Sequence, residues 1–237
     1  MPNAAREQQE LAESIANDGW AITPPVLPQL AIDRLVGTIE SLGTDDGRGG
    51  LRNLFETTPA VRELSRSDAV RTVAEAVLGP HCFATRVILF DKTPRANWKV
   101  TWHQDLTIAV RERAPIQGFG PWSEKEGIPH VQPPVELLER MLAVRVHLDC
   151  CDSDNGPVRV LTGSHRVGRL SGAAIDDWRA ARPSVDCLVE RGGILAFRPL
   201  ILHASSAATS PSHRRVLHFE FAAEDLPAPL EWHSRVA

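Results

Sequence analysis

The spacing of apolar residues divides the chain into a helical front and a strand-rich remainder. Up to about residue 80, apolar side chains recur every three or four positions, which is the period of a helix with one buried face. Capping and turn-forming residues mark four helical segments: 5–18, 28–42, a segment opened by Thr58-Pro59, and 67–78. We therefore expect residues 1–80 to be mostly helical, with a short strand at 20–22 and a loop rich in glycine and aspartate at 43–50.

From Cys82 onward the pattern changes to short runs of β-branched and alternating residues. These runs predict about eight short strands: 83–90, 99–105, 142–148, 158–161, 185–190, 194–197, 200–205 and 216–221. After the turn at 152–157, we expect strand 158–161 to return as a hairpin partner of 142–148. Short strands behind a helical front favour a closed or double-sheet β fold with helices packed outside.

Alternation within the predicted strands assigns a face to each of two arginines. In the first long strand, Arg86 shares a face with Ile88 and Phe90, and in strand 142–148, Arg145 lies opposite the apolar face. A buried arginine needs a polar partner. For Arg86 three interpretations stay open: a surface charge, an internal ion pair, or a contact with a bound substrate.

Residues 106–132 show neither the helical nor the strand period. They are rich in glycine and proline around large apolar side chains, among them Phe119 and Trp122. A long irregular segment in a compact domain is usually functional or disordered. We expect a lid over the functional site, with Phe119 and Trp122 facing an organic substrate. The alternative is a structural loop packed by its own side chains.

Composition narrows the class of protein. The 237 residues suffice for one domain with a sizeable core, and we expect residues 1–237 to form a single domain. The formal net charge of -4, without a basic tract, argues against a nucleic-acid partner. No apolar run reaches membrane-spanning length and the first ten residues are polar, so we expect no membrane association and a cytoplasmic location. Four cysteines, with Cys150 and Cys151 adjacent, are too few for a disulfide scaffold and suit a reducing compartment.

A metal-ligand pattern lies in Trp102-His103-Gln104-Asp105. In an extended segment, His103 and Asp105 point to one face and Gln104 to the other. The pair alone is common by chance, as a histidine near a solvated aspartate. A second imidazole is available downstream from His203. Two imidazoles and one carboxylate on one face of a metal are the ligand set of non-haem Fe(II) oxygenases, which leave the other positions open.

Two arginines, Arg214 and Arg215, open the last predicted strand shortly after His203. A hairpin return of this length is expected to bring an arginine beside this histidine. Guanidinium suits bidentate recognition of carboxylates. A dicarboxylate such as 2-oxoglutarate could bind iron through its keto-acid end and the arginine through its far carboxylate. The alternative is a solvated pair of charges at the start of a strand.

Four short motifs follow one another along the strand-rich part of the chain: Trp102-His103-Gln104-Asp105, Asn155-Gly156-Pro157, Gly163-Ser164-His165-Arg166, and His203-x-Ser205 followed by Arg214. Their order resembles the phytanoyl-CoA dioxygenase family, over roughly residues 83–222 and more loosely over the helical front. The resemblance implies a double-stranded β-helix core, that is, a cupin-like jelly roll. It also implies Fe(II) as cofactor, with 2-oxoglutarate and O2 as cosubstrates.

The resemblance further assigns roles to individual residues. The residues it implies are the iron ligands His103, Asp105 and His203 and the cosubstrate-binding residues Arg214, Ser205 and, less directly, Arg145. The turn at Gly163-Ser164-His165 is expected to be structural, so His165 is not counted as a ligand. Arg86, Phe119 and Trp122 are the candidates for contact with the substrate.

The implied activity is hydroxylation of an unactivated C–H bond of a small organic metabolite, with release of succinate and CO2. Halogenating relatives replace the carboxylate ligand with a small residue, and the presence of Asp105 favours hydroxylation over that reaction. Desaturation and ring closure stay open, because they begin with the same hydrogen abstraction. Two other classes also stay open: a non-catalytic metal-binding jelly roll that acts as a sensor or structural protein, and a cupin-type hydrolase or isomerase with another divalent metal. The second of these leaves the arginine without a role.

Overall fold

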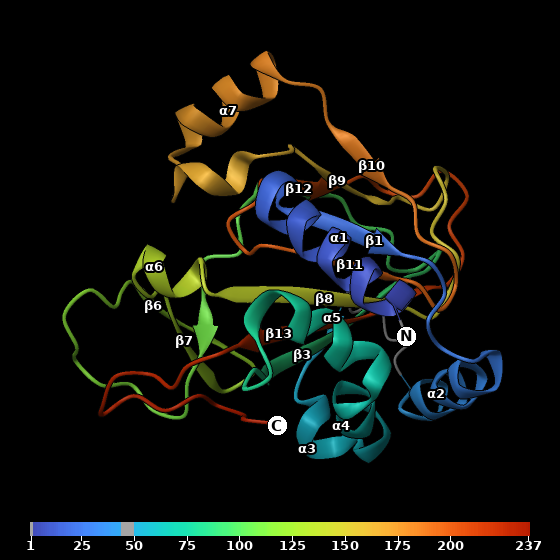
Figure 1. Cartoon of the computed structure of the whole chain (residues 1–237), viewed down its shortest axis with the longest axis horizontal. Helices are drawn as coiled ribbons and strands as arrows, with labels where there is room; N and C mark the ends of the chain where they lie inside the picture. Colours follow the sequence, from blue (N-terminus) through green and yellow to red (C-terminus); the bar gives the residue numbers. More distant parts are fainter. Residues whose placement is uncertain (1, 44–49) are drawn as a thin grey trace.

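The computed structural model describes residues 2–43 and 50–237, and its centre is a pair of facing antiparallel sheets (Figure 1). The six-stranded sheet runs in the order β1 (Trp20–Thr23), β11 (Ile194–Phe197), β8 (Met141–His147), β13 (Arg214–Ala222), β3 (Phe83–Lys92), β2 (Gly50–Leu51). The four-stranded sheet runs β10 (Val185–Cys187), β9 (Val158–Val160), β12 (His203–Ser205), β4 (Val100–His103). The predicted class, a mainly β jelly-roll core with flanking helices and a helical N-terminal part, is confirmed.

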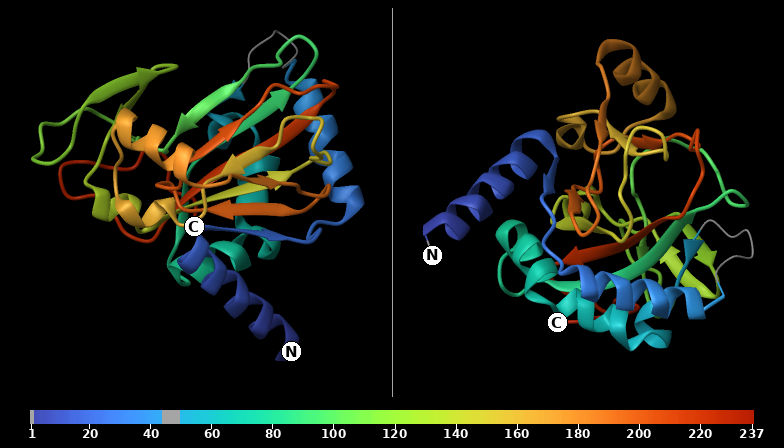
Figure 2. Two further views of the ribbon diagram at one scale, coloured as in Figure 1. Left: turned by 90° about the horizontal axis from the view of Figure 1, so that it is seen from above. Right: turned by 90° about the vertical axis from the view of Figure 1, so that its right-hand side faces the viewer.

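Helices of the front cover the outer face of the six-stranded sheet (Figure 2, right). They are α2 (Gln29–Ser41), α3 (Leu54–Thr57), α4 (Pro59–Arg66) and α5 (Asp68–Leu78), whereas α1 (Pro2–Asp18) packs against α5 and β1 and its N-terminal end projects from the body. Four of these five helices match the predicted segments, and α3 was not predicted because a single turn is too short to show a helical period. The loop expected at 43–50 lies largely outside the described residues.

Alternation along the long strands separates an apolar outer face from a polar inner face. In β8, Leu142, Val144 and Val146 pack beneath the helices, whereas Arg145 and His147 point inward, as predicted. In β3 and β13 the outer residues Val87, Leu89, Leu217 and Phe219 are again apolar, and the charged pair Asp91 and Arg215 lies at the end of that face. The buried polar or charged residues on the inner face are Arg214, His218 and Glu220 of β13 and Lys92 of β3. The interior between the sheets is therefore partly polar, which a purely structural core would not require.

The predicted hairpin between 142–148 and 158–161 is wrong. Strand β9 pairs with β10 and β12 in the smaller sheet, because both edges of β8 are already occupied by β11 and β13. The turn at 152–157 instead carries the chain from one sheet to the other. Short alternating strands define which face is buried but not which neighbour they join.

Residues 106–132 form regular structure where none was expected. A third sheet runs β5 (Ile108–Ala109), β7 (Ile128–Val131), β6 (Trp122–Lys125). Its strands are too short for a period of two to emerge from the sequence. Ile108 and Val131 are completely buried in an apolar cluster with Phe83 and Trp232, so part of the expected lid is anchored to the core.

The remaining elements connect the sheets at their ends. They are α6 (Val135–Leu138), the 3-10 helix η1 (Ser164–Val167) and α7 (Gly172–Ala181), which projects from the body and buries no residue. All four cysteines are free, as expected. Over the described part of the chain, no helix combines the length and apolar character needed to cross a membrane.

Candidate metal centre and cosubstrate pocket

Two histidines from distant parts of the sequence face each other in the smaller sheet. His103 ends β4 and His203 begins β12, and the two are direct partners in the antiparallel register. Their ring centroids lie 4.2 Å apart. Each ring binds the backbone carbonyl two residues earlier through Nδ1, at 2.8 Å to Thr101 and at 2.9 Å to Ile201. This contact orients both rings and leaves both Nε2 atoms free to bind a metal.

Asp105, which lies two residues after His103 and just beyond the end of β4, completes the cluster. Its carboxylate oxygens lie 3.7 Å from His103 Nε2 and 3.7 Å from His203 Nε2. Among the residues that the structure describes, these three form the one His/Asp/Glu/Cys group that could hold a metal ion, with all ligand atoms within 4.8 Å of one another. The structure therefore brings together the three predicted ligands.

Buried polar residues hold the two ligand segments in place. Gln104 points away from the cluster, as the alternation predicts, and donates to the carbonyls of Gly168 and Leu200 at 2.8 and 2.7 Å. On the other segment, Ser164 accepts from the Leu202 amide at 2.8 Å, directly before His203. The Gly163-Ser164-His165 turn is thus structural, as expected, and its serine positions a ligand strand.

The charge environment suits a cation between these side chains. Burial acts to raise the pKa of Asp105, but His203, His218, His103 and Arg86 together hold it well below its usual range. Burial lowers the pKa of His203 to about 4, against the opposing effect of Asp105. A carboxylate and neutral imidazoles are the protonation states that metal binding requires. The His103 and Asp105 side chains are 38% and 27% exposed, so one side of the cluster is open.

A cavity of about 100 Å³ extends from this cluster between the two sheets. Its lining combines the three predicted ligands with apolar and cationic residues: Ile88, Phe90, Trp98, Val100, His103, Asp105, Arg145, Val158, His203, Ala204, Ser205, Arg214 and His218. The three residues predicted to bind the cosubstrate, Arg145, Ser205 and Arg214, all line it. They therefore share one cavity with the three predicted metal ligands, and their contact with the cosubstrate stays a prediction.

The Arg214 guanidinium lines this cavity without an ion pair to a carboxylate in the described part of the chain, and only its backbone amide donates to one, Asp91 Oδ1 at 3.2 Å. Arg214 is 2% exposed, and its Nη1 donates to the Gly156 carbonyl at 2.6 Å. Its Nε is buried without a partner, and burial lowers its pKa. Because β12 and β13 belong to different sheets, Arg214 faces His203 across the cavity and is not its hairpin neighbour, which corrects the predicted connection.

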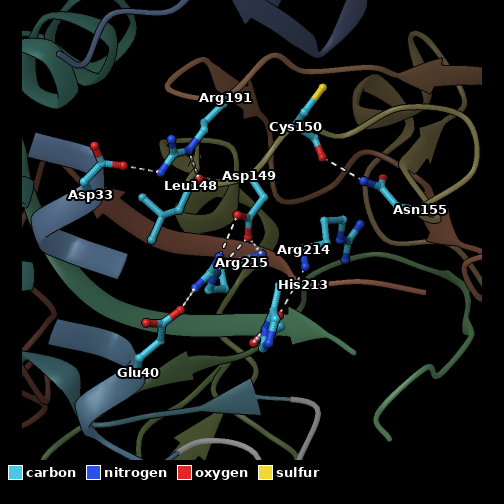
Figure 3. A network of polar contacts seen from close by, with 11 residues as sticks. Asp33, Glu40, Leu148, Asp149, Cys150, Asn155, Arg191, His213, Arg214 and Arg215 are labelled. Carbon is cyan, nitrogen blue, oxygen red and sulfur yellow. Dashed lines mark hydrogen bonds and ion pairs between the residues drawn. The ribbon is translucent and has the colours of Figure 1, made fainter. Parts of the chain in front are cut away.

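Arg215 points to the opposite side of the same strand (Figure 3). It makes ion pairs with Asp149 at 2.8 Å and with Glu40 of α2 at 2.7 Å. Adjacent arginines therefore have different environments: the Arg215 guanidinium pairs with two carboxylates, whereas the Arg214 guanidinium makes no ion pair with a described carboxylate.

A chain of polar contacts crosses the inner face of the larger sheet. Arg145 Nη1 donates to His218 Nδ1 at 3.1 Å, so the other ring nitrogen of His218 carries the proton toward Glu220, at 3.6 Å. Glu220 in turn pairs with Arg86. Of the open interpretations for Arg86, the structure shows the internal ion pair, and Arg86 does not line the cavity at the metal cluster.

Phe119 and Trp122 also lie outside that cavity lining. Both pack against the apolar cluster built on Ile108 and Val131. This is the packing expected of a segment held by its own side chains, and their contact with a substrate stays a prediction.

Sequence reasoning missed Lys92, His218 and Glu220. The sequence did contain a pattern that indicates them. His218 and Glu220 follow Arg214 at even spacing, and Lys92 follows Arg86 at even spacing, so in a strand each set shares one face. The predicted strands stopped at 90 and began at 216, which hid part of this alternation.

The residues present fit Fe(II) and 2-oxoglutarate. Two free imidazole nitrogens and a carboxylate converge, as a facial iron site requires. The Nε atoms of Arg145 and Arg214 are buried without a hydrogen-bond partner. Binding of an anion in this cavity would therefore be favourable, because it would offer acceptors to these two cationic groups.

Comparison with known proteins agrees with this geometry. AviO1 from Streptomyces viridochromogenes Tue57 superposes with a TM-score of 0.68 at 23% identity, over 93% of this chain and 96% of that one. The non-heme alpha ketoglutarate dependent carbocyclase SnoK from nogalamycin biosynthesis gives a TM-score of 0.73 at 16% identity, over 94% and 86%. EctD from S. alaskensis gives 0.71 at 17%, over 93% and 79%. These likenesses show the fold.

The sequence comparison identifies the family. None of the curated protein sequences compared with this chain matches it. The family model for phytanoyl-CoA dioxygenase (PhyH) matches residues 18–216, which is most of the chain. Fe(II), 2-oxoglutarate and O2, the cofactor and cosubstrates predicted from sequence, are those of this family. The chain therefore belongs to the phytanoyl-CoA dioxygenase family of Fe(II)- and 2-oxoglutarate-dependent oxygenases.

Proposed function

We propose that this oxygenase hydroxylates an unactivated C–H bond of a small organic metabolite, with release of succinate and CO2. The observation that carries the proposal is the convergence of His103, Asp105 and His203 on one cavity with Arg214, a buried guanidinium that no described carboxylate neutralises. A metal site alone would not need that arginine, so the pair of features favours a cosubstrate-dependent enzyme over a structural metal protein.

When bound, iron and 2-oxoglutarate together supply oxidative decarboxylation coupled to activation of O2. The chain's own residues would hold these groups in place. His103 and His203 offer Nε2 because their Nδ1 atoms are occupied by backbone carbonyls, and Asp105 offers its ionised carboxylate. Arg214 and Ser205 would bind the far carboxylate of 2-oxoglutarate in a buried pocket, where a charge-assisted hydrogen bond is strong.

Arg145 has a role distinct from that of Arg214. His218 binds its Nη1 and is itself held by Glu220, so the guanidinium is fixed while its Nε remains unpaired. We assign Arg145 to the wall of the cosubstrate pocket, where its charge favours binding of a dianion. Pre-organisation of this kind lowers the cost of ordering side chains on binding.

The substrate would reach the metal from the side on which His103 and Asp105 are exposed. We retain residues 106–132 as a candidate cover for this side, restricted to the exposed stretch between the buried strands β5 and β7. Phe119 and Trp122 would contact the substrate only after moving from their present packing. Arg86 would contribute through its ion pair with Glu220, not by direct contact.

We infer that the partners are a small-molecule substrate, without nucleic acid or membrane. The four free cysteines and the use of ferrous iron support a cytoplasmic location.

The test is a turnover screen. The purified protein is incubated with Fe(II), 2-oxoglutarate and a metabolite library under ¹⁸O2, and succinate and products are followed by mass spectrometry. Hydroxylation predicts substrate-stimulated succinate and a product that carries one ¹⁸O atom. Loss of two hydrogens without added oxygen would assign the chain to ring closure or desaturation, and one solved neighbour is named a carbocyclase. Iron binding without any binding of 2-oxoglutarate would favour the non-catalytic metal protein.

A further inference from the structure

We propose that Lys92 is a positioning residue for the far carboxylate of the cosubstrate: it fixes Ser205 and the Gly156 carbonyl beside Arg214 and adds a second positive charge at this end of the cavity. The inference rests on the proposed function and extends it to a residue that does not itself line the cavity.

Lys92 joins the two sheets at the closed end of the cavity. It ends β3, it is 0% exposed, and it is the direct cross-strand partner of Arg214. Its Nζ donates to Ser205 Oγ at 2.6 Å, to the Ser206 carbonyl, and to the Gly156 carbonyl at 3.4 Å. The first two acceptors are the last residue of β12, which starts with His203, and the residue directly after it, and the third belongs to the turn before β9.

The Gly156 carbonyl is shared by three donors. Arg214 Nη1 reaches it at 2.6 Å, Ser205 Oγ at 3.0 Å, and Lys92 Nζ at 3.4 Å. Since Ser205 Oγ accepts from Lys92, its own proton is directed to Gly156. Lys92 thereby sets the position of both groups that would meet the carboxylate, Ser205 directly and Arg214 through the shared carbonyl.

The turn at Gly156 packs closely against Lys92 and Ser206. Gly156 has φ +69°, and a Cβ there would stand 2.4 Å from the Ser206 carbonyl oxygen and 2.8 Å from Lys92 Nζ. Only glycine meets both the backbone conformation and the close approach. The Lys92 ammonium also lies 5.8 Å from the centre of the Trp98 ring, which lines the cavity.

Two like charges directly opposite each other are unfavourable unless an anion joins them. Lys92 and Arg214 form such a pair, Arg145 is close enough to add to it, and within the described residues no ion pair links any of the three to a carboxylate. Burial, followed by the charge of Arg214, lowers the pKa of Lys92 to about 7. An incoming carboxylate would relieve this repulsion, which is why the cluster favours a dianionic cosubstrate.

The experiment compares two keto acids that differ only at the far end, 2-oxoglutarate and 2-oxopentanoate, which lacks the far carboxylate. Their affinities for the Fe(II)-loaded protein are measured by calorimetry without oxygen, for wild type, Lys92→Met and the exposed control Lys99→Met. We expect wild type and Lys99→Met to prefer 2-oxoglutarate. Lys92→Met should weaken 2-oxoglutarate by roughly 10-fold to 100-fold, as for a lost charged hydrogen bond, and change 2-oxopentanoate by less than about 2-fold.

If Lys92→Met weakens the binding of both keto acids equally, Lys92 has a merely structural role. If the variant binds both keto acids as wild type does, Lys92 has no role in binding the cosubstrate. Either result overturns the inference while wild-type binding keeps the proposed function intact. A wild-type protein that does not prefer 2-oxoglutarate would instead contradict the proposed function.

If Lys92→Met does not fold, the wild-type preference measured from pH 6 to pH 9 decides. Of the other groups that face Lys92, Arg145 stays mainly cationic over this range, since burial lowers its pKa only to about 10, and Arg214 is a guanidinium as well. Burial raises the pKa of the Cys151 thiol, and it also raises the pKa of the Asp91 carboxyl, which pairs with His213. His147 on β8 is neutral, because burial lowers its pKa well below 6.5. The preference should fall as the ammonium loses its proton, and a preference that stays constant over this range would overturn the inference.

Discussion

His103 and His203 are direct partners across the β4–β12 strand pair, with ring centroids 4.2 Å apart, although they are distant in the sequence. The pairing means that the two imidazoles reach the metal position from adjacent strands of one sheet, and Asp105 reaches it from the turn that follows β4. Each ring is oriented by a carbonyl two residues earlier in its own strand. The backbone pairing of β4 with β12 therefore brings the two imidazoles together, and Gln104 and Ser164 hold the two ligand segments.

From this relationship we predict that His103→Ala, Asp105→Ala and His203→Ala each lose iron binding and turnover but keep the fold, because a facial site has no spare protein ligand. Iron per chain is measured by elemental analysis, and the fold by the Tm of the metal-free protein. His165→Ala is the matched control, since this ring contacts the Ala16 carbonyl, outside the cluster. Full iron content and activity in one of the three variants would remove that residue from the site.

The three predicted metal ligands and Arg214 could be predicted from the sequence because each lies in a short motif. The order of these motifs along the chain can be read without knowing which strands pair. Lys92, His218 and Glu220 were not found, because their importance depends on which strands lie beside β13. Register with β3 and β8 places them on a shared inner face, and no local pattern contains that information. For the same reason the partner of β9 was assigned wrongly, and the small sheet of β5, β6 and β7 was expected to be an irregular lid.

The candidate cover predicts a divided pattern of hydrogen exchange. Ile108 and Val131 are 0% exposed, and the Val110 amide donates to the Pro129 carbonyl at 3.0 Å, so 108–110 and 128–131 should remain protected in every state. Residues 111–127 are mostly exposed and should gain protection when substrate joins the Fe(II)- and 2-oxoglutarate-loaded protein. Equal protection of 111–127 with and without substrate would argue against a moving cover.

The buried ammonium of Lys92 predicts a pH dependence of stability. Its pKa is about 7 in the folded chain, against an ordinary value of 10.5. Between these values the unfolded chain binds more protons at this site than the folded chain, so the free energy of unfolding rises with pH by up to about 1.4 kcal/mol per unit. Well below pH 7 both states are protonated and the penalty is complete.

Urea unfolding of metal-free wild type and Lys92→Met at several pH values measures this effect. The wild-type value minus the variant value should increase from pH 7 to pH 9 and become level below pH 6. A difference that does not change over the whole range would show that Lys92 keeps its ordinary pKa in the fold.

Arg215→Leu should lower stability without affecting cosubstrate binding. The substitution leaves Asp149, whose side chain is 18% exposed, without its partner, and it also removes the pair with Glu40 of α2. We expect a loss of about 1–3 kcal/mol in the free energy of unfolding, as for an unsatisfied, partly buried acceptor. Thermal and urea unfolding measure it, and a Tm equal to that of wild type would show that these pairs contribute little.

The most direct test of the account is a 2-oxoglutarate titration of Arg214→Leu and Arg215→Leu with Fe(II) held saturating. The two residues are adjacent, but Arg214 faces the cavity with the metal ligands and Arg215 faces away (Figure 3). Losing one partner of a desolvated charge pair costs about 2–5 kcal/mol, so Arg214→Leu should bind 2-oxoglutarate roughly 30-fold to several thousand-fold more weakly, with iron affinity unchanged. Arg215→Leu should bind 2-oxoglutarate almost as wild type does. Wild-type affinity in Arg214→Leu would contradict the assignment of this cavity as the 2-oxoglutarate pocket.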